Sequence, residues 1–215
     1  MDRRLFLAAL RVAVASLTLV AIVVQAADIA GRGVLVPANF LSYFTIQSNL
    51  IGAAVLLIGA ARHRVPATRG WDIVRGVATL NLTVTFVVFS LLLSGTDVDT
   101  AVPWVNSVVH GIFPLAVIAD WLIDPPGGRI SFRRSLWWLA YPLGWLGYTM
   151  IRGPIAGWYP YPFLDPANGG YGGVAVYVVG ILVFGLVLGA ALAAIGNALQ
   201  DRRVVPAAGA ASVQG

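Results

Sequence analysis

The sequence predicts an all-α protein, a bundle of about six helices that crosses a membrane with both termini on the cytoplasmic side. Three observations predict this fold. Hydrophobic residues make up 59% of the 215 residues and charged residues only 11%, with a mean hydropathy of +0.83. The apolar residues gather into stretches of about 20, which cross a hydrocarbon core of roughly 30 Å. The arginines gather in alternate links between these stretches, as the positive-inside rule requires.

Six apolar stretches fit a membrane span, and short links separate them. In order they are Leu5–Ile29, Phe40–Ala61, Trp71–Leu93, Val102–Ile123, Leu136–Ile151 and Val174–Leu199. The fifth is short and contains Pro142, Gly144 and Gly147, so we expect a kinked or broken helix there. Residues 1–203 then form a single transmembrane domain, and 204–215 are expected to be a disordered cytoplasmic tail.

Arginine placement predicts the orientation, because positive charge near span ends is retained in the cytoplasm. The predicted inner side carries Arg3, Arg4, Arg62, Arg64, Arg69, Arg75, Arg129, Arg133, Arg134, Arg202 and Arg203. The outer side carries Arg32 and Arg152. Orientation explains the pI near 10.1 better than nucleic-acid binding, which we do not expect. All basic residues are arginine and all acidic ones aspartate, which looks like codon bias of a GC-rich genome and carries no functional weight. We expect a multi-pass protein of a bacterial inner membrane.

The first stretch has a second interpretation. Met1–Ala27 resembles a signal peptide, since Arg3 and Arg4 precede an apolar run that ends Val24-Gln25-Ala26. Arg11 interrupts that run. Cleavage would leave five spans in an unchanged orientation, so the charge pattern is compatible with both interpretations.

Polar side chains inside the spans indicate either helix packing or a functional site, because an unsatisfied polar group in hydrocarbon costs several kcal/mol. The second span opens with Ser42-Tyr43-Phe44-Thr45-Ile46-Gln47-Ser48-Asn49, the third carries Asn81, Thr83, Thr85 and Ser90, and the fourth carries Asn106, Ser107 and His110. For Thr83, Thr85 and Ser90 we prefer helix packing. Histidine differs, because it is costly to place in lipid and titrates near neutral pH.

Depth predicts that Thr45 and His110 can meet. Both spans run from outside to inside, with His110 roughly 12 Å past Val102 and Thr45 about 8 Å past Phe40, at 1.5 Å per residue. Asn106 lies on the same helical face as His110, where its amide could fix the imidazole tautomer. We expect no metal and no cofactor, because the chain lacks cysteine and has no second histidine or glutamate near His110.

The last outer loop, residues 157–166, mixes aromatic rings with stiff prolines. Such a loop fits an aromatic belt at the lipid headgroups, or a lid over the polar cluster. Arg152 lies near the outer end of the fifth span, where it could bind an anionic headgroup or a carboxylate. Snorkelling of Arg152 to the interface is an equally good interpretation.

Three short blocks carry a resemblance to a known family: Tyr43-Phe44-Thr45, then Trp104-Val105-Asn106-Ser107-Val108-Val109-His110 followed by Pro114, then Tyr161-Pro162-Phe163-Leu164-Asp165. In these blocks the sequence resembles the androgen-induced, ADTRP-like family of multi-span membrane proteins. Animal members of that family hydrolyse fatty acid esters of hydroxy fatty acids with a threonine nucleophile and a histidine base. The resemblance implies these roles for Thr45 and His110. Asn106 matches an asparagine of the family, and Asp165 stands where the animal proteins carry glutamate.

The expected function is that of a carboxylic ester hydrolase acting on a lipid ester in the outer half of the bilayer. His110 would take the proton of Thr45, with Asn106 as its orienting partner. Because Ile46-Gln47-Ser48-Asn49 departs from the animal sequences, Ser48 is an alternative nucleophile. The candidate oxyanion donors are Asn49, Asn81 and Tyr148, and the candidate pocket also includes Arg152 and Tyr161.

Two other function classes fit the same residues. One is a lipid or small-molecule binding or transport protein that uses the same cavity without chemistry. The other is a membrane scaffold whose polar residues only join helices. All three classes share the lipid bilayer as a partner.

Overall fold

The computed structural model describes residues 2–93 and 102–209, and every secondary-structure element in those ranges is helical. In chain order the elements are α1 (Arg3–Gly31), α2 (Pro37–Phe40), α3 (Phe44–Ala61), α4 (Arg69–Val88), η1 (Phe89–Leu93), α5 (Pro103–Ser107), η2 (Val108–Ile112), α6 (Phe113–Ile123), α7 (Phe132–Ser135), η3 (Leu136–Leu139), α8 (Ala140–Ala156), η4 (Pro162–Leu164), η5 (Pro166–Asn168) and α9 (Gly170–Gly209). Elements η1 and η2 are π-helical, whereas η3, η4 and η5 are 3-10 helices. The all-α prediction is therefore confirmed.

Five helical segments of the described chain are long and apolar enough to cross a membrane. They are Arg3–Gly31, Phe44–Ala61, Arg69–Leu93, Pro103–Ile123 and Gly170–Arg202. The remaining predicted stretch, Leu136–Ile151, lies in η3 and α8, and α8 has only 17 residues. The described residues thus give five candidate crossings where the sequence predicts about six, as expected of a multi-pass membrane protein.

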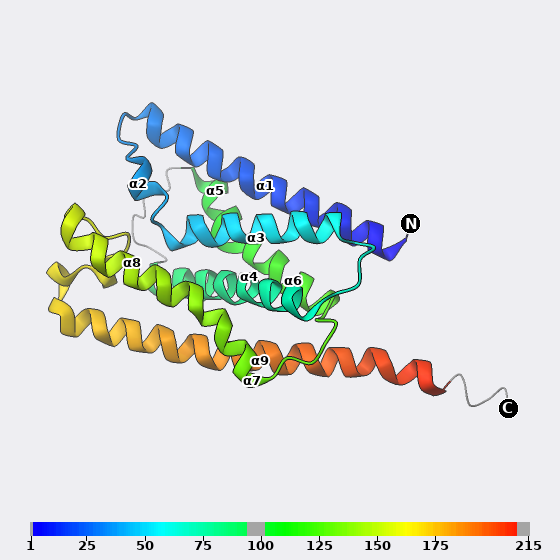
Figure 1. Ribbon diagram of the computed structural model, residues 1–215. Helices are drawn as coiled ribbons and strands as arrows, with labels where there is room; N and C mark the ends of the chain where they lie inside the picture. Colours follow the sequence, from blue (N-terminus) through cyan, green and yellow to red (C-terminus); the bar gives the residue numbers. More distant parts are fainter. Residues whose placement is uncertain (1, 94–101, 210–215) are drawn as a thin grey trace.

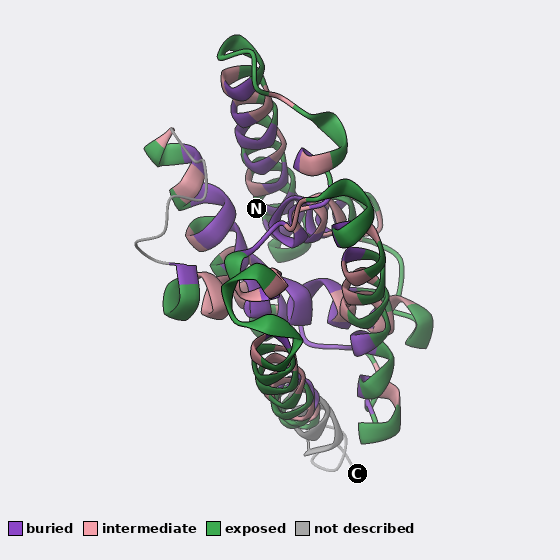
Figure 2. Ribbon diagram, turned by 90° about the vertical axis from the view of Figure 1, so that its left-hand side faces the viewer, coloured by how far each residue is buried: buried purple, intermediate pink, exposed green. Residues whose placement is uncertain are grey.

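The long helices lie side by side, and α1 begins at the end of the bundle at which α9 ends (Figure 1). Helix α1 packs on α3, α3 on α4, and α4 on both α6 and α9. Figure 2 shows buried residues on the inward faces and exposed ones on the outward faces. Buried positions recur every three or four residues along α1, as on one face of a helix: Leu7, Arg11, Ala15, Thr18, Ile22, Gln25 and Ile29.

The outward faces are apolar, which is the pattern of a surface in contact with lipid. Val23 of α1 and Val176 of α9 each expose more than half of their surface. Helix α9 continues to Gly209, so it extends into the segment 204–215 that the sequence predicts to be disordered. Adding residues to an existing helix costs much less than starting one. The rest of that segment, 210–215, lies outside the described residues.

The irregularity predicted near Pro142 takes the form of the 3-10 segment η3, directly before α8. Pro142 is the third residue of α8. Its missing N–H costs no bond there, because the first four N–H groups of a helix have no partner within the helix. Gly144 and Gly147 lie inside the regular part of α8. The proline therefore marks the beginning of a helix and leaves α8 itself unbroken.

Close approach of η3 to α4 depends on Gly76. The fully buried indole of Trp138 lies against Gly76, and a Cβ at this position would collide with the ring. Trp138 in turn meets Trp121 of α6 edge to face, with ring centroids 5.6 Å apart. A small residue at such a contact is the usual way for membrane helices to approach closely.

We predict that Gly76→Ala destabilises the protein by about 1–3 kcal/mol, because the added methyl group overpacks the buried indole of Trp138. Thermal unfolding in detergent measures the effect. Gly144→Ala is the matched control, since no described atom lies within 4 Å of the added Cβ and alanine favours a helix. A Gly76→Ala protein as stable as this control would contradict the packing argument.

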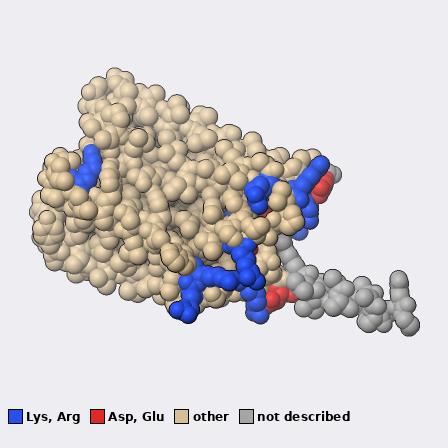
Figure 3. All heavy atoms as spheres, in the orientation of Figure 1, with Lys and Arg blue, Asp and Glu red and all other residues tan. Residues whose placement is uncertain are grey.

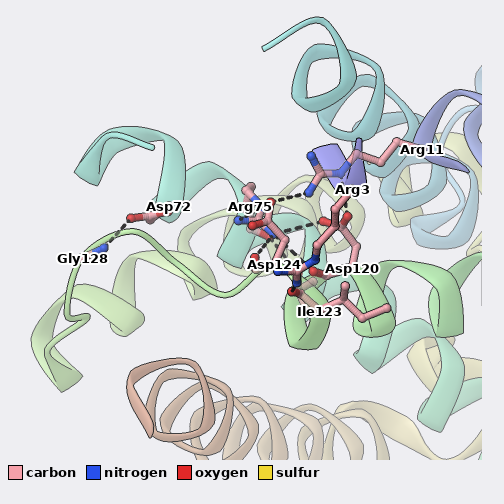
Figure 4. Close-up of polar contacts among 9 residues, drawn as sticks. Arg3, Arg11, Asp72, Arg75, Asp120, Ile123, Asp124 and Gly128 are labelled. Carbon is pink, nitrogen blue, oxygen red and sulfur yellow. Dashed lines mark hydrogen bonds and ion pairs between the residues drawn. The ribbon is translucent and has the colours of Figure 1, made fainter. Parts of the chain in front are cut away.

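Charged side chains form a buried cluster at the end of the bundle where α1 begins (Figure 4). Arg11 of α1 forms ion pairs of 2.6 Å with both Asp120 and Asp124. Arg75 of α4 forms an ion pair of 3.0 Å with Asp120 of α6. Both arginines are buried, and the Asp120 side chain is only 11% exposed. This charge cluster connects α1 to α4 and α6.

Asp120→Asn is expected to lower stability by about 3–5 kcal/mol, because it leaves two buried arginines without their shared carboxylate. Asp201→Asn makes the same chemical change in an exposed pair with Arg129 and should cost less than about 1 kcal/mol. Unfolding of both variants in the same detergent compares the two costs. Similar losses of stability in the two variants would show that the buried ion pairs stabilise the protein no more than the exposed pair does.

Candidate active site

Thr45 and His110 come together from two different helices. Thr45 is the second residue of α3, and His110 lies in the π-helical segment η2. The Thr45 Oγ1 atom is 3.3 Å from the His110 Nε2 atom. Both side chains are buried, at 7% and 8% exposure. The hydroxyl and the imidazole are thus hydrogen-bonded inside the bundle. Counting residues along the two spans predicts that they lie at similar depths.

The π-helical segment that carries His110 has a local cause. Pro114 has no N–H to offer to the carbonyl of His110, four residues earlier. The N–H of Phe113 instead donates to the carbonyl of Val108, five residues earlier, which is the π-helical pattern. Segments of this kind occur mostly as single turns inside α-helices, and frequently at functional sites. The local sequence therefore favours an irregular turn at His110.

Asn106 fixes the orientation and the tautomer of His110. Its Oδ1 atom is 2.6 Å from the His110 Nδ1 atom. Because an amide oxygen only accepts hydrogen bonds, Nδ1 carries the ring proton. The Nε2 atom is then left to accept a hydrogen bond from the Thr45 hydroxyl. This is the arrangement that the sequence predicts for Asn106.

Phe89 covers the ring of His110, a contact that the sequence does not predict. The two rings are stacked, with centroids 3.8 Å apart and planes inclined by 13°. Phe89 begins η1, so a second π-helical segment supplies this neighbour. An apolar residue within an apolar run carries no sequence signal of such a role.

Tyr161 makes a second contact to Thr45, from the loop before η4. Its hydroxyl is 3.3 Å from the Thr45 Oγ1 atom and accepts a hydrogen bond of 3.2 Å from the Thr45 N–H. Burial raises the pKa of the Tyr161 hydroxyl to about 12, so it keeps its proton near neutral pH. Tyr161 can therefore donate to Thr45, which donates to His110, which donates to Asn106. We call these four residues the hydrogen-bond relay.

The relay lies between two small cavities. The first holds about 80 Å³ and lies between α3, α4, η1, α8 and α9. The second holds about 60 Å³ and lies between α1, α3, α5 and η2. Thr45, Leu93 and Tyr161 line both cavities, and His110 lines the second. Most of the remaining lining is apolar, so the polar atoms of the relay stand where two apolar spaces meet.

Ser48 and Asn49 are buried beside Thr45 and hold the beginning of α3 in place. Ser48 Oγ donates to the carbonyl of Thr45 at 3.1 Å and lies 3.0 Å from the hydroxyl of Thr85. Asn49 Nδ2 donates to the carbonyls of Thr45, at 2.8 Å, and of Val109, at 3.0 Å. These contacts favour Thr45 over Ser48 as the hydroxyl with a base. They also make Asn49 a link between α3 and η2.

Three other residues predicted for the site, Tyr148, Arg152 and Asn81, do not line either of the two described cavities. Tyr148 is 44% exposed, and its hydroxyl is 2.8 Å from Ser42 Oγ. Arg152 donates to Asn39 Oδ1 at 2.7 Å and stacks on the ring of Trp158. Asn81 is fully buried in α4, and among the described residues its amide has no hydrogen-bond partner. Neither Tyr148 nor Asn81 forms a hydrogen bond with a relay residue within the part of the chain that the structure describes.

Comparison with known proteins adds no family to this geometry: no protein-family model, no curated protein and no solved structure matches the chain. Within the described ranges, no group of three or more His, Asp or Glu side chains could hold a metal ion. What the relay can do chemically follows from its donors and acceptors. A hydroxyl that donates to a neutral imidazole is the arrangement of an activated nucleophile.

We predict that the His110 imidazole is protonated at Nδ1, which nitrogen-15 NMR of the His63→Gln protein reads from a single histidine. Asn106→Leu removes the acceptor and should give a mixture of both tautomers. Ser107→Ala is the matched control, because Ser107 donates to the carbonyl of Pro103. A ring protonated mainly at Nε2 in the parent protein would contradict the proposed direction of the relay.

Proposed function

We propose that this protein is an intramembrane carboxylic ester hydrolase that cleaves a lipid ester, with Thr45 as nucleophile and His110 as base. One observation carries the proposal. The Thr45 hydroxyl lies 3.3 Å from both the His110 Nε2 atom and the Tyr161 hydroxyl, where two apolar cavities meet. The resemblance to the ADTRP-like family supports the same chemistry and suggests fatty acid esters of hydroxy fatty acids as substrates.

In the first step Thr45 Oγ1 attacks the ester carbonyl, and its proton moves to His110 Nε2. A hydroxyl is a weak nucleophile without such a base. The imidazolium that forms keeps its hydrogen bond to Asn106, and the stacked ring of Phe89 offers it a π face. The protonated Nε2 then donates its proton to the leaving alcohol, and an acyl-threonine remains. A water molecule, deprotonated by the same nitrogen, releases the acid and restores Thr45.

The negative charge on the former carbonyl oxygen needs donors. Tyr161 is protonated near neutral pH, since burial raises a pKa that is already high, and its hydroxyl lies beside Thr45. The N–H of Thr45 belongs to the first turn of α3, where N–H groups lack partners within the helix and the helix dipole favours negative charge. We assign these two groups as the oxyanion donors, in place of Tyr148 and Asn81.

We further propose six crossings, with both termini in the cytoplasm of a bacterial cell and the relay in the outer half of its inner membrane. The continuous helical run from Phe132 to Ala156 supports α7, η3 and α8 as the additional crossing. Figure 3 shows most arginine side chains at the end of the bundle where α1 begins. The positive-inside rule assigns that end to the cytoplasm. The cavities beside Thr45 then lie at the depth of the acyl chains of the outer leaflet.

The proposal predicts that a fluorophosphonate probe labels the purified protein at Thr45 and that Thr45→Ala abolishes the labelling. His110→Ala should slow labelling by about 10²- to 10⁴-fold, since the general base is lost. Thr83→Ala makes the same change at a hydroxyl that donates to the carbonyl of Thr79, and should leave labelling unchanged. Mass spectrometry of the labelled peptide identifies the residue.

Hydrolysis of a panel of lipid esters, including fatty acid esters of hydroxy fatty acids, completes the test. Activity that Thr45→Ala removes and Thr83→Ala retains supports the hydrolase. Labelling at another residue would reassign the nucleophile. A folded protein that binds these lipids but neither reacts with the probe nor hydrolyses any of them would be a lipid-binding protein.

A further inference from the structure

A basic hollow lies at the other end of α3 from the relay, separated from Thr45 by the length of this 18-residue helix. It has a volume of about 440 Å³ and lies between the beginning of α1, the end of α3 and the beginning of α4. Five arginines line it: Arg3, Arg4, Arg11, Arg62 and Arg75. The acidic side chains in its described lining are Asp2 and Asp124.

Two of the five arginines have their charge balanced by the buried cluster shown in Figure 4. Arg11 pairs with Asp120 and Asp124, and Arg75 pairs with Asp120. The other three form no ion pair with a described residue. Arg3 donates to the carbonyl of Ile123 at 2.8 Å, which is a contact to a neutral group. The positive charge of the hollow therefore exceeds what its own carboxylates neutralise.

Arg62 supplies an unsatisfied donor in the wall of the hollow. Its Nε atom is buried, and among the described residues it has no hydrogen-bond partner. Its guanidinium lies over the ring of Trp71, 5.3 Å from the centroid, which holds the group in place. A buried donor without an acceptor is unfavourable, and such groups usually have a bound partner. This Nε atom is closed off from the hollow itself, so an anion there would contact the terminal nitrogens of Arg62, which form no ion pair with a described residue.

Two helix N-termini border the same space. Helix α1 begins at Arg3, with Arg4 in its first turn, and α4 begins at Arg69, close to the lining residues Ala67 and Trp71. The positive end of a helix dipole attracts anions, phosphate groups in particular. Guanidinium groups match phosphate oxygens with paired hydrogen bonds. Asp2 and Thr68 already accept one N–H group at each of these N-termini, so the guanidinium groups are the principal donors for such a ligand.

We propose that the basic hollow binds a phosphate ester group, with Arg4 and Arg62 as its principal donors. A phospholipid headgroup is the source that the surroundings favour, because Leu5 and Phe6 of α1 are each 49% exposed and offer an apolar surface to acyl chains. A soluble phosphate ester has the same chemistry without the chains. This site is separate from the relay and independent of the proposed hydrolase.

The test uses the full chain in nanodiscs of phosphatidylcholine, with and without phosphatidic acid, and a parallel titration with glycerol 3-phosphate. Native mass spectrometry and thermal unfolding measure binding. Arg4→Gln combined with Arg62→Gln should weaken phosphatidic acid binding at least about tenfold, since two charge-assisted contacts are lost. Arg133→Gln combined with Arg202→Gln is the matched control, because both are exposed arginines outside the described lining. The control should bind as the parent does.

The two sources give different results. Tight binding of phosphatidic acid that glycerol 3-phosphate does not displace supports the lipid headgroup. Binding of glycerol 3-phosphate with the same dependence on Arg4 and Arg62 supports a soluble phosphate ester. Equal weakening by both double variants, or no binding of either probe by a protein that unfolds cooperatively, would overturn the proposal. Probe labelling at Thr45 is measured separately, so failure of this site and failure of the hydrolase proposal are distinguishable.

Discussion

Neutralisation of buried charge is the constraint on which this bundle depends. Lipid chains are as apolar as the helix surfaces, so apolar burial does little to hold membrane helices in one register. Hydrogen bonds and ion pairs between helices therefore contribute more to fixing that register. Asp120 supplies such contacts to Arg11 of α1 and Arg75 of α4 at once. The same helices run on to the other end of the bundle, where they surround the relay. A charge cluster at one end thus helps to set the alignment of side chains at the other.

The relay combines two kinds of structure. The beginning of α3 is held firmly, since Ser48 and Asn49 both donate to the carbonyl of Thr45. Its partners come from irregular segments: His110 from a π-helical turn and Tyr161 from the loop before η4. A regular helix positions Thr45 along the bundle, and irregular segments bring His110 and Tyr161 to it. Neither type of segment would build the site by itself.

Much of this structure could be predicted from the sequence, and the limits of that prediction have physical causes. The hydropathy of the sequence located the apolar helices. Counting residues along two of them predicted that Thr45 and His110 lie at similar depths. Depth says nothing about the direction of a side chain around its helix, which is why Tyr148 and Arg152 were expected in the pocket and lie elsewhere. The partners of Arg11 were missed because ion pairs between distant helices leave no local pattern.

The π-helical turn at His110 has an evolutionary consequence. Such a turn is what remains when one residue is inserted into a regular helix, and one residue corresponds to about 100° of rotation. Loss of a single codon between Asn106 and Pro114 would restore a regular helix and turn the imidazole away from Thr45, while the hydrophobic length of the segment stayed almost the same. Closely similar chains could therefore gain or lose the pair through one small indel, without any visible change in their membrane topology.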